Sequence, residues 1–180
     1  DGSSGQVLAT NGSGALSWST ISAGESVTGL SDGLVEDNSM YIGNYPSSST
    51  STAEYNVAVG TTALDAVTTG DKNVAVGYDA LTANTTGAWN NAIGHEALRS
   101  LTTGSYNTAT GNGALYSNTT GVQNTASGSF SLRSNTTGDS NTASGYKSLY
   151  ANTTGTRNLA IGYSAYDNAD TENDNLAIGY

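Results

Sequence analysis

The feature that most constrains this chain is a repeat with a fixed period of 17 residues. Its clearest copy runs from Asn73 to Trp89, and its third, fifth and ninth positions are almost always alanine, glycine and leucine. The asparagine at the first position recurs without insertion or deletion at Asn56, Asn73, Asn90, Asn107, Asn124, Asn141, Asn158 and Asn175. Such a short, unbroken period predicts a solenoid, in which each copy buries its apolar side chains only against its neighbours.

Positions 1 to 5 of the unit alternate in the manner of a β-strand. Asparagine, alanine and glycine share one face, whereas positions 2 and 4 share the other face and change from valine to threonine or serine in the middle copies. We therefore place the alanine and leucine positions where packing is tightest, and positions 2 and 4 in looser surroundings. The recurring first asparagine predicts a ladder of side-chain amides at a turn, each bonded to the next copy.

The second half of the unit has two interpretations. Positions 5, 8, 9 and 12 match the spacing of a helical stripe, as in Gly94, Ala97, Leu98 and Leu101, which predicts a short helical turn. Parallel strands lie about 4.8 Å apart and packed helices about 8 to 10 Å, so a helix in every copy would separate the strands. A second short strand at positions 7 to 10, or strands of three chains interleaved around one axis, would avoid this conflict.

The expected fold class is therefore mainly all-β, either a β-solenoid or β-roll or an interleaved triple β-helix. We expect a homotrimer, because one leucine and one alanine per unit give a single chain little apolar burial to offset the entropy of ordering it.

Composition argues against several classes of protein. Charged residues make up only 11% of the chain and the net charge is -10, with basic groups limited to Lys72, Arg99, Arg133, Lys147 and Arg157. Nucleic acid is not an expected partner, because phosphate contacts need a basic surface. The chain has no apolar stretch of the roughly 18 residues that membrane insertion requires. It also has no cysteine, which removes disulfides and thiol chemistry.

The order of motifs predicts three parts. Residues 1–37 form a β-hairpin and connector, because two alternating stretches flank Asn11-Gly12-Ser13-Gly14, a sequence that favours a tight turn. Residues 38–55 are an atypical capping repeat. Residues 56–180 hold seven full repeats and a partial one, which we expect to continue beyond Tyr180.

The repeat also resembles known families. Its N-x-A-x-G core resembles the head repeats of trimeric autotransporter adhesins, and the full N-T-A-x-G-x-x-A-L-x-x-N-T-T-G unit resembles repeats of phage tail-fibre proteins. The segment from Gly5 to Trp18, G-Q-V-L-A-T-N-G-S-G-A-L-S-W, strengthens the second resemblance. The resemblance implies a homotrimeric, β-rich rod on a virion or outside a cell that presents a receptor-binding end. The 17-residue length and the Thr-Thr-Gly depart from the adhesin heads, so their left-handed roll is not carried over.

No motif predicts catalysis or a cofactor. The single histidine, His95, stands where other copies have tyrosine, asparagine or serine, so we interpret it as a surface variant. A Ser-His-Asp set would need His95, yet no Gly-x-Ser-x-Gly elbow precedes a helix. One acidic loop, with Asp167, Asp170, Glu172 and Asp174, has oxygen ligands of the kind that bind calcium, but its spacing is not that of an EF-hand. A solvated acidic loop is the default interpretation and a calcium site the alternative.

Two surface patterns remain. Position 10 varies freely and carries Arg99, Tyr116, Arg133 and Tyr150, residue types that suit glycan contact through stacking and bidentate hydrogen bonds; surface variation is the alternative. The paired threonines at positions 13 and 14 suggest ice binding, although adjacent residues of a strand point to opposite faces. Four glycosylation sequons, at Asn84, Asn118, Asn135 and Asn152, follow from the period itself.

These patterns predict a structural, non-enzymatic fibre segment of a virion, such as a phage tail fibre, that acts as a rigid spacer and display rod for host recognition. Its expected partners are its own copies, other virion or fibre proteins and a host surface glycan. A bacterial surface trimeric adhesin head is the alternative, and an ice-binding solenoid is an alternative of another class.

Overall fold

The structure is a computed structural model of the whole chain, which describes residues 6–10, 16–20, 33–36, 38–43, 52–168 and 170–180. Every regular element in these residues is a β-strand, so none of them forms a helix that could span a membrane. Strands β1 (Gln6–Thr10) and β2 (Leu16–Thr20) pair antiparallel in a separate two-stranded sheet. The predicted hairpin turn between them, and the connector up to Asp32, lie outside the described residues.

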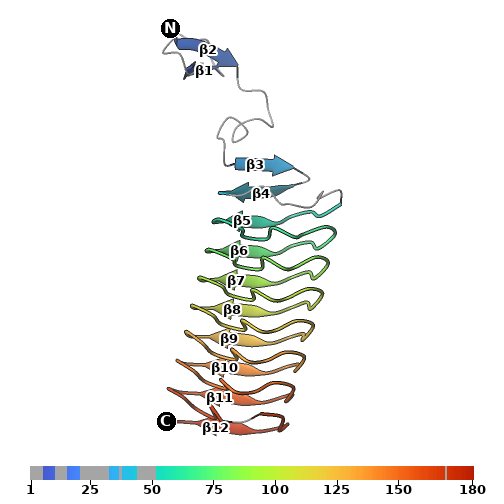
Figure 1. Cartoon of the computed structure of the whole chain (residues 1–180), viewed down its shortest axis with the longest axis vertical. Coiled ribbons are helices and arrows are strands. Elements are labelled where there is room, and N and C mark those ends of the chain that lie inside the picture. Colours follow the sequence, from blue (N-terminus) through green and yellow to red (C-terminus); the bar gives the residue numbers. More distant parts are fainter. Residues whose placement is uncertain (1–5, 11–15, 21–32, 37, 44–51, 169) are drawn as a thin grey trace.

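The repeat forms one ten-stranded sheet, whose strands follow each other in chain order (Figure 1). It begins with β3 (Gly33–Glu36) and β4 (Ser39–Ile42), which pair antiparallel. All later neighbours pair in parallel: β5 (Val57–Val59), β6 (Val74–Val76), β7 (Asn91–Ile93), β8 (Thr108–Thr110), β9 (Thr125–Ser127), β10 (Thr142–Ser144), β11 (Leu159–Ile161) and β12 (Leu176–Ile178). The predicted β-solenoid is confirmed.

We call each 17-residue turn of the solenoid a rung, and count its positions from the first asparagine. Each strand residue pairs with the residue at the same position of the next rung, as Ala58 does with Ala75. Because the chain's own successive rungs are hydrogen-bonded neighbours, the alternative of strands interleaved from three chains is wrong for this ladder. Strand β3 belongs to the part that we predicted to lie outside the repeat, yet it covers the edge that β4 would otherwise leave unpaired.

The predicted helical turn is also wrong, and positions 7 to 10 form no second strand. Positions 7 and 9 have positive φ in every described full rung, for example 54° at Asp79 and 52° at Leu81. The Leu81 N–H donates to the carbonyl of Ala97 in the next rung, at 3.0 Å. A helix would direct this N–H back along its own turn, whereas here the segment stays in the ladder between rungs and keeps the close rung spacing.

The core includes the two residue columns that the repeat predicts, and a third buried column at position 8, as at Ala97. The alanines at position 3, such as Ala92 and Ala126, are fully buried, as are the leucines at position 9, such as Leu98 and Leu132. They belong to one continuous cluster along the solenoid. Positions 2 and 4 are half-buried or exposed, so the predicted assignment of the two strand faces is confirmed.

Glycine at position 5 is required by both conformation and space. Gly128 has φ of 136°, a region open almost only to glycine. A Cβ on Gly128 would lie 2.5 Å from the carbonyl oxygen of Gly145 in the next rung. The rungs therefore approach too closely for a side chain where each strand ends.

Two ladders of buried asparagines hold successive rungs together. At position 1, the Asn107 Nδ2 donates to the carbonyl of Gly121 at 2.9 Å and closes its own rung, while its Oδ1 accepts from the Asn124 N–H at 3.0 Å. This confirms the predicted amide ladder. The second ladder, at position 12, was not predicted: Asn135 Nδ2 donates to Asn118 Oδ1 at 3.1 Å. The four repeat sequons fall on this buried position, which makes their asparagines part of the fold.

Candidate functional site

A column of alternating cations and aromatic rings crosses three successive rungs at position 10. The Arg99 guanidinium lies 5.6 Å from the centre of the Tyr116 ring, and the Arg133 guanidinium lies 4.8 Å from the same ring. Arg99 Nη1 also donates to the Tyr116 hydroxyl at 3.0 Å. Tyr116 is thus held between two positive charges that the in-register ladder brings to neighbouring positions.

The column continues across positions 6 and 7 into the next rung. Arg133 lies 5.8 Å from the centre of the Phe130 ring, which packs edge-on against Tyr146 at 6.1 Å. The Lys147 ammonium lies 5.5 Å from the Tyr146 ring and 5.3 Å from the Tyr150 ring. We call this set the cation–aromatic patch; it comprises Arg99, Tyr116, Phe130, Arg133, Tyr146, Lys147 and Tyr150.

Local backbone geometry makes room for the patch. Phe130 occupies position 7, where φ is 60°, and its ring lies over Gly113, the residue at position 7 of the preceding rung. A Cβ on Gly113 would approach Cδ1 of Phe130 to 3.0 Å. The glycine therefore leaves the space that the Phe130 ring uses.

The cations of the patch differ in their acidic partners. Arg99 Nε bonds Asp79 Oδ2 at 3.1 Å, and this hydrogen bond, with the Coulombic contribution of Tyr116, raises the pKa of Arg99. In the described part of the chain, no carboxylate lies within ion-pairing distance of Arg133 or Lys147. These two positive charges stand at the surface of a chain whose net charge is -10.

The four residues predicted as a glycan-facing surface are brought together in part. Arg99, Tyr116 and Arg133 contact one another directly, whereas Tyr150 joins them only through Lys147. Sequence reasoning missed Phe130, Tyr146 and Lys147, because it followed position 10 alone. The available signal was the presence of basic and aromatic residues at positions 6 and 7 of the same rungs.

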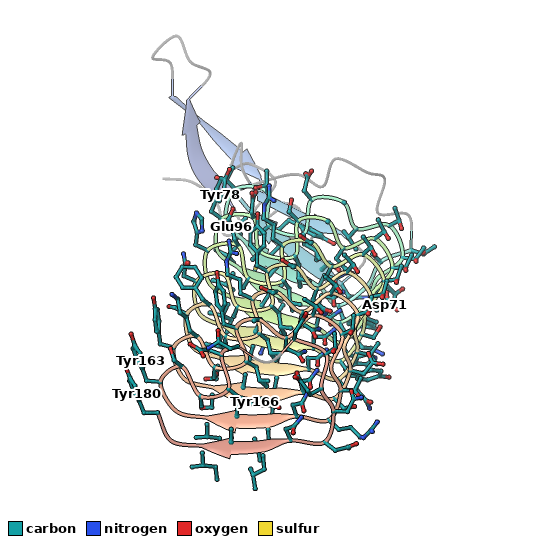
Figure 2. All side chains as sticks on the ribbon, turned by 60° about the horizontal axis from the view of Figure 1, so that its bottom comes forward. Asp71, Tyr78, Glu96, Tyr163, Tyr166 and Tyr180 are labelled. Carbon is teal, nitrogen blue, oxygen red and sulfur yellow. The ribbon has the colours of Figure 1, made fainter. Side chains whose placement is uncertain are left out.

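Two further aromatic columns lie at positions 17 and 6. Lys72 lies 5.9 Å from the ring of Tyr55 and 4.5 Å from that of Trp89, which stacks on Tyr106 at 6.3 Å. At position 6, the sequential rings of Tyr146, Tyr163 and Tyr180 stack at 5.2 and 5.4 Å. Figure 2 shows Tyr163 and Tyr180 at one edge of the stack, on the side opposite Asp71. Their ring faces cover one another, so these columns offer mainly ring edges to a ligand.

His95 takes part in the position 6 column. Its ring stacks on Tyr78 at 5.2 Å, and its Nδ1 lies 3.5 Å from the Glu96 carboxylate. Its side chain is 52% exposed. These contacts agree with its interpretation as a surface variant.

The acidic loop uses its carboxylates internally. The Glu172 carboxylate accepts hydrogen bonds from the N–H groups of Asp170 at 3.0 Å and Thr171 at 3.2 Å, and backbone hydrogen bonds lower the pKa of Glu172. Asp174 pairs with Arg157, whose hydrogen bond lowers the Asp174 pKa. Among the described residues, which exclude Ala169 of this loop, no three acidic or histidine side chains are arranged to hold a metal ion. Asp167, Asp170, Glu172 and Asp174 thus form no described calcium site.

The paired threonines have different environments. At position 13 the hydroxyl donates to the carbonyl of the same position in the next rung, as Thr119 does to Thr136 at 3.1 Å. Position 14 is exposed, for example at Thr120. Only one of the two threonine columns therefore offers free hydroxyl groups, which weakens the ice-binding interpretation based on this pair.

Fold and surface together define the class of this protein: a single-chain parallel β-solenoid with stacked aromatic and basic residues on its surface. Comparison of the chain with models of protein families, with curated proteins and with solved structures finds no match.

Proposed function

We propose that this chain is a structural segment of a phage tail fibre or similar virion appendage, where it acts as a rigid spacer and as a display rod for host recognition. The observation that supports this role best is the unbroken parallel ladder from β4 to β12, in which every rung repeats the pairing of the one before. Such a ladder grows in one dimension, as a spacer requires. The proposed role needs no catalytic group.

Hydrogen bonds on several sides of each rung support rigidity. Between two middle rungs, the Thr108 N–H donates to Asn124 and the Leu115 N–H donates to Ser131, at 2.8 and 3.0 Å. On a further side, the Thr119 N–H donates to the carbonyl of Thr136 at 2.9 Å. Bending the rod would stretch bonds on one of these sides, so the ladder resists bending in all directions.

Three copies would associate through the outer face of the sheet. Positions 2 and 4 place valine, leucine and isoleucine in line at both ends of the stack, and Ile93 and Ile161 are 42% and 41% exposed. Exposed apolar residues in line at these two ends favour association, because burial removes them from water. Around a three-fold axis this face would supply the burial that a narrow alanine and leucine core lacks.

The oligomer can be tested by light scattering and by electron microscopy of the assembled protein. We expect a trimeric mass at micromolar concentration and a rod with three-fold symmetry, which rises about 4.8 Å per rung. A folded monomer at that concentration would refute the trimer. Immunogold labelling of virions and of bacterial cells would separate the phage fibre from the alternative, a bacterial surface trimeric adhesin head.

One observation favours the second candidate function, ice binding. The outer faces of β8, β9 and β10 carry two columns of hydroxyl groups, at Thr108, Thr110, Thr125, Ser127, Thr142 and Ser144. This array covers three strands only and is flanked by valine, leucine and isoleucine. Thermal hysteresis at millimolar protein, lost in Thr108→Val and Thr125→Val, would support this candidate over the fibre.

A further inference from the structure

We propose that the cation–aromatic patch binds an anionic polysaccharide, with Arg133 and Lys147 as the donors to its carboxylate or phosphate groups. The inference deepens the proposed function, since it assigns a ligand class to the recognition surface of the rod, and in that sense rests on it. The interaction itself requires only the solenoid surface.

The first argument is the concentration of charge. The chain has five basic residues against fifteen acidic ones, and three of the basic residues, Arg99, Arg133 and Lys147, lie in this one patch. Asp65 and Asp167 occupy position 10 on either side of the patch, so the positive section is bounded along the rod. A local positive surface on an acidic protein attracts an anionic section of a ligand.

The second argument is the availability of donors. The Asp79 carboxylate accepts a hydrogen bond from the Nε of Arg99, whereas Arg133 and Lys147 have no carboxylate partner in the described part of the chain. Their contacts among the described residues are with ring faces, which attract the cation but accept no strong hydrogen bond. The N–H groups at the edge of the Arg133 guanidinium therefore have no acceptor among the described residues and suit bidentate contact with a carboxylate or phosphate.

The third argument is shape. Position 10 of successive rungs repeats about every 4.8 Å, so the patch extends about 14 Å from Arg99 to Tyr150 along the rod. Tyr116 and Tyr150 are half-exposed, and their hydroxyls suit hydrogen bonds to sugar hydroxyls. Rings that hold the cations in place reduce the side-chain entropy that binding would otherwise cost. A linear chain of a few sugar units, with an acidic group at intervals, fits this narrow strip.

The test compares two double variants with the same net charge. Arg133→Gln with Lys147→Gln removes both proposed donors, whereas Lys72→Gln with Arg157→Gln removes two basic groups at position 17, outside the patch. Binding is measured by isothermal titration at about 0.1 M salt, where charges more than about 10 Å apart are largely screened. The probes are polygalacturonate, a polyribitol phosphate and neutral dextran. The first two probes separate a carboxylate from a phosphate source of the same anionic chemistry.

We expect wild type to bind one of the two anionic polysaccharides and not dextran. The patch variant should lose affinity about tenfold or more, as expected for charge-assisted contacts, and the control variant less than about twofold. Equal losses in the two variants, no binding of either anionic polysaccharide, or equal binding of dextran would overturn the proposal. Equal affinity for single-stranded DNA of matched charge would overturn the assignment to carbohydrate. Light scattering on the same samples measures whether the protein is a trimer. Absence of the trimeric rod can therefore be distinguished from absence of polysaccharide binding.

Discussion

The backbone N–H of Asn141 donates to Oδ1 of Asn124, 2.9 Å away in the preceding rung, and Asn141 Nδ2 donates to the same oxygen at 3.1 Å. Asn124 Nδ2 in turn donates to the carbonyl of Gly138 at 2.8 Å. One fully buried amide therefore closes its own rung and joins it to the next. An amide supplies donors and acceptors together, which a carboxylate does not.

The first prediction concerns Asn124→Asp. One carboxylate oxygen would keep the two donors of Asn141, but the other would face the carbonyl of Gly138. A buried charge without a counter-charge costs about 3 kcal/mol or more in the free energy of unfolding. Gln123→Glu makes the same chemical change on an exposed neighbour and should cost less than about 0.5 kcal/mol. Urea unfolding of both variants at neutral pH measures the contrast, and equal midpoints would contradict it.

The loss in Asn124→Asp should depend on pH. Burial and the facing carbonyl of Gly138 raise the folded-state pKa of the new carboxyl above its unfolded value of about 3.9. Below that pH the group is protonated in both states, so the extra cost is absent; it grows as pH rises towards the folded-state pKa. Unfolding midpoints of the variant and wild type should therefore converge near pH 4. A difference that is constant with pH would show that shape, and not charge, causes the loss.

The second prediction compares the two faces of one strand. Ala126 is fully buried, so Ala126→Leu should cost about 1 to 3 kcal/mol per chain through overpacking. Ser127 points outward and is exposed, and other rungs carry Val59 or Val76 there, so Ser127→Val should be neutral or stabilising. Thermal unfolding of the two variants provides the comparison. A larger loss for Ser127→Val would mean that the outward face is more tightly packed than its exposure indicates.

The third prediction compares two glycines with positive φ. At Gly128 a Cβ meets the backbone of the next rung, so Gly128→Ala should cost about 3 kcal/mol or more and disturb the ladder. At Gly113, φ is 59° and the nearest atoms belong to a half-exposed phenylalanine ring. Asparagine tolerates this conformation, so Gly113→Asn should cost about 1 kcal/mol or less. Chemical unfolding measures both, and a Gly128→Ala variant as stable as Gly113→Asn would contradict the close rung approach.

The fourth prediction concerns calcium. Because Glu172 accepts from its local backbone and Asp174 pairs with Arg157, added calcium meets no prepared set of carboxylates among the described residues of this loop. The melting temperature should be the same with millimolar calcium and with a chelator. A calcium-dependent rise that Asp167→Asn abolishes would instead establish the calcium site.

Much of this architecture could be predicted because each copy of the repeat places the same residue types at the same positions. The period predicted the rungs, the alternation around Ala126 predicted the strand and its inward face, and the recurring Asn124 position predicted the amide ladder. Each of these features depends on residues close in sequence, or on copies of one position placed in register. The strand β3 carries no copy of the repeat, which is why its addition to the sheet was not expected.

The repeat thus indicates a β-solenoid with an alanine and leucine interior, because apolar positions that recur in strict register suit a closely spaced ladder. The path of positions 7 to 10 follows only from the folded chain, since a helix and a turn with positive φ at Leu81 present the same spacing of apolar residues. The choice depends on whether the Leu81 N–H bonds along its own chain or to Ala97 in the next rung. The same geometry places Phe130, Arg133 and Lys147 in one patch, because residues at different positions meet only when neighbouring rungs stack.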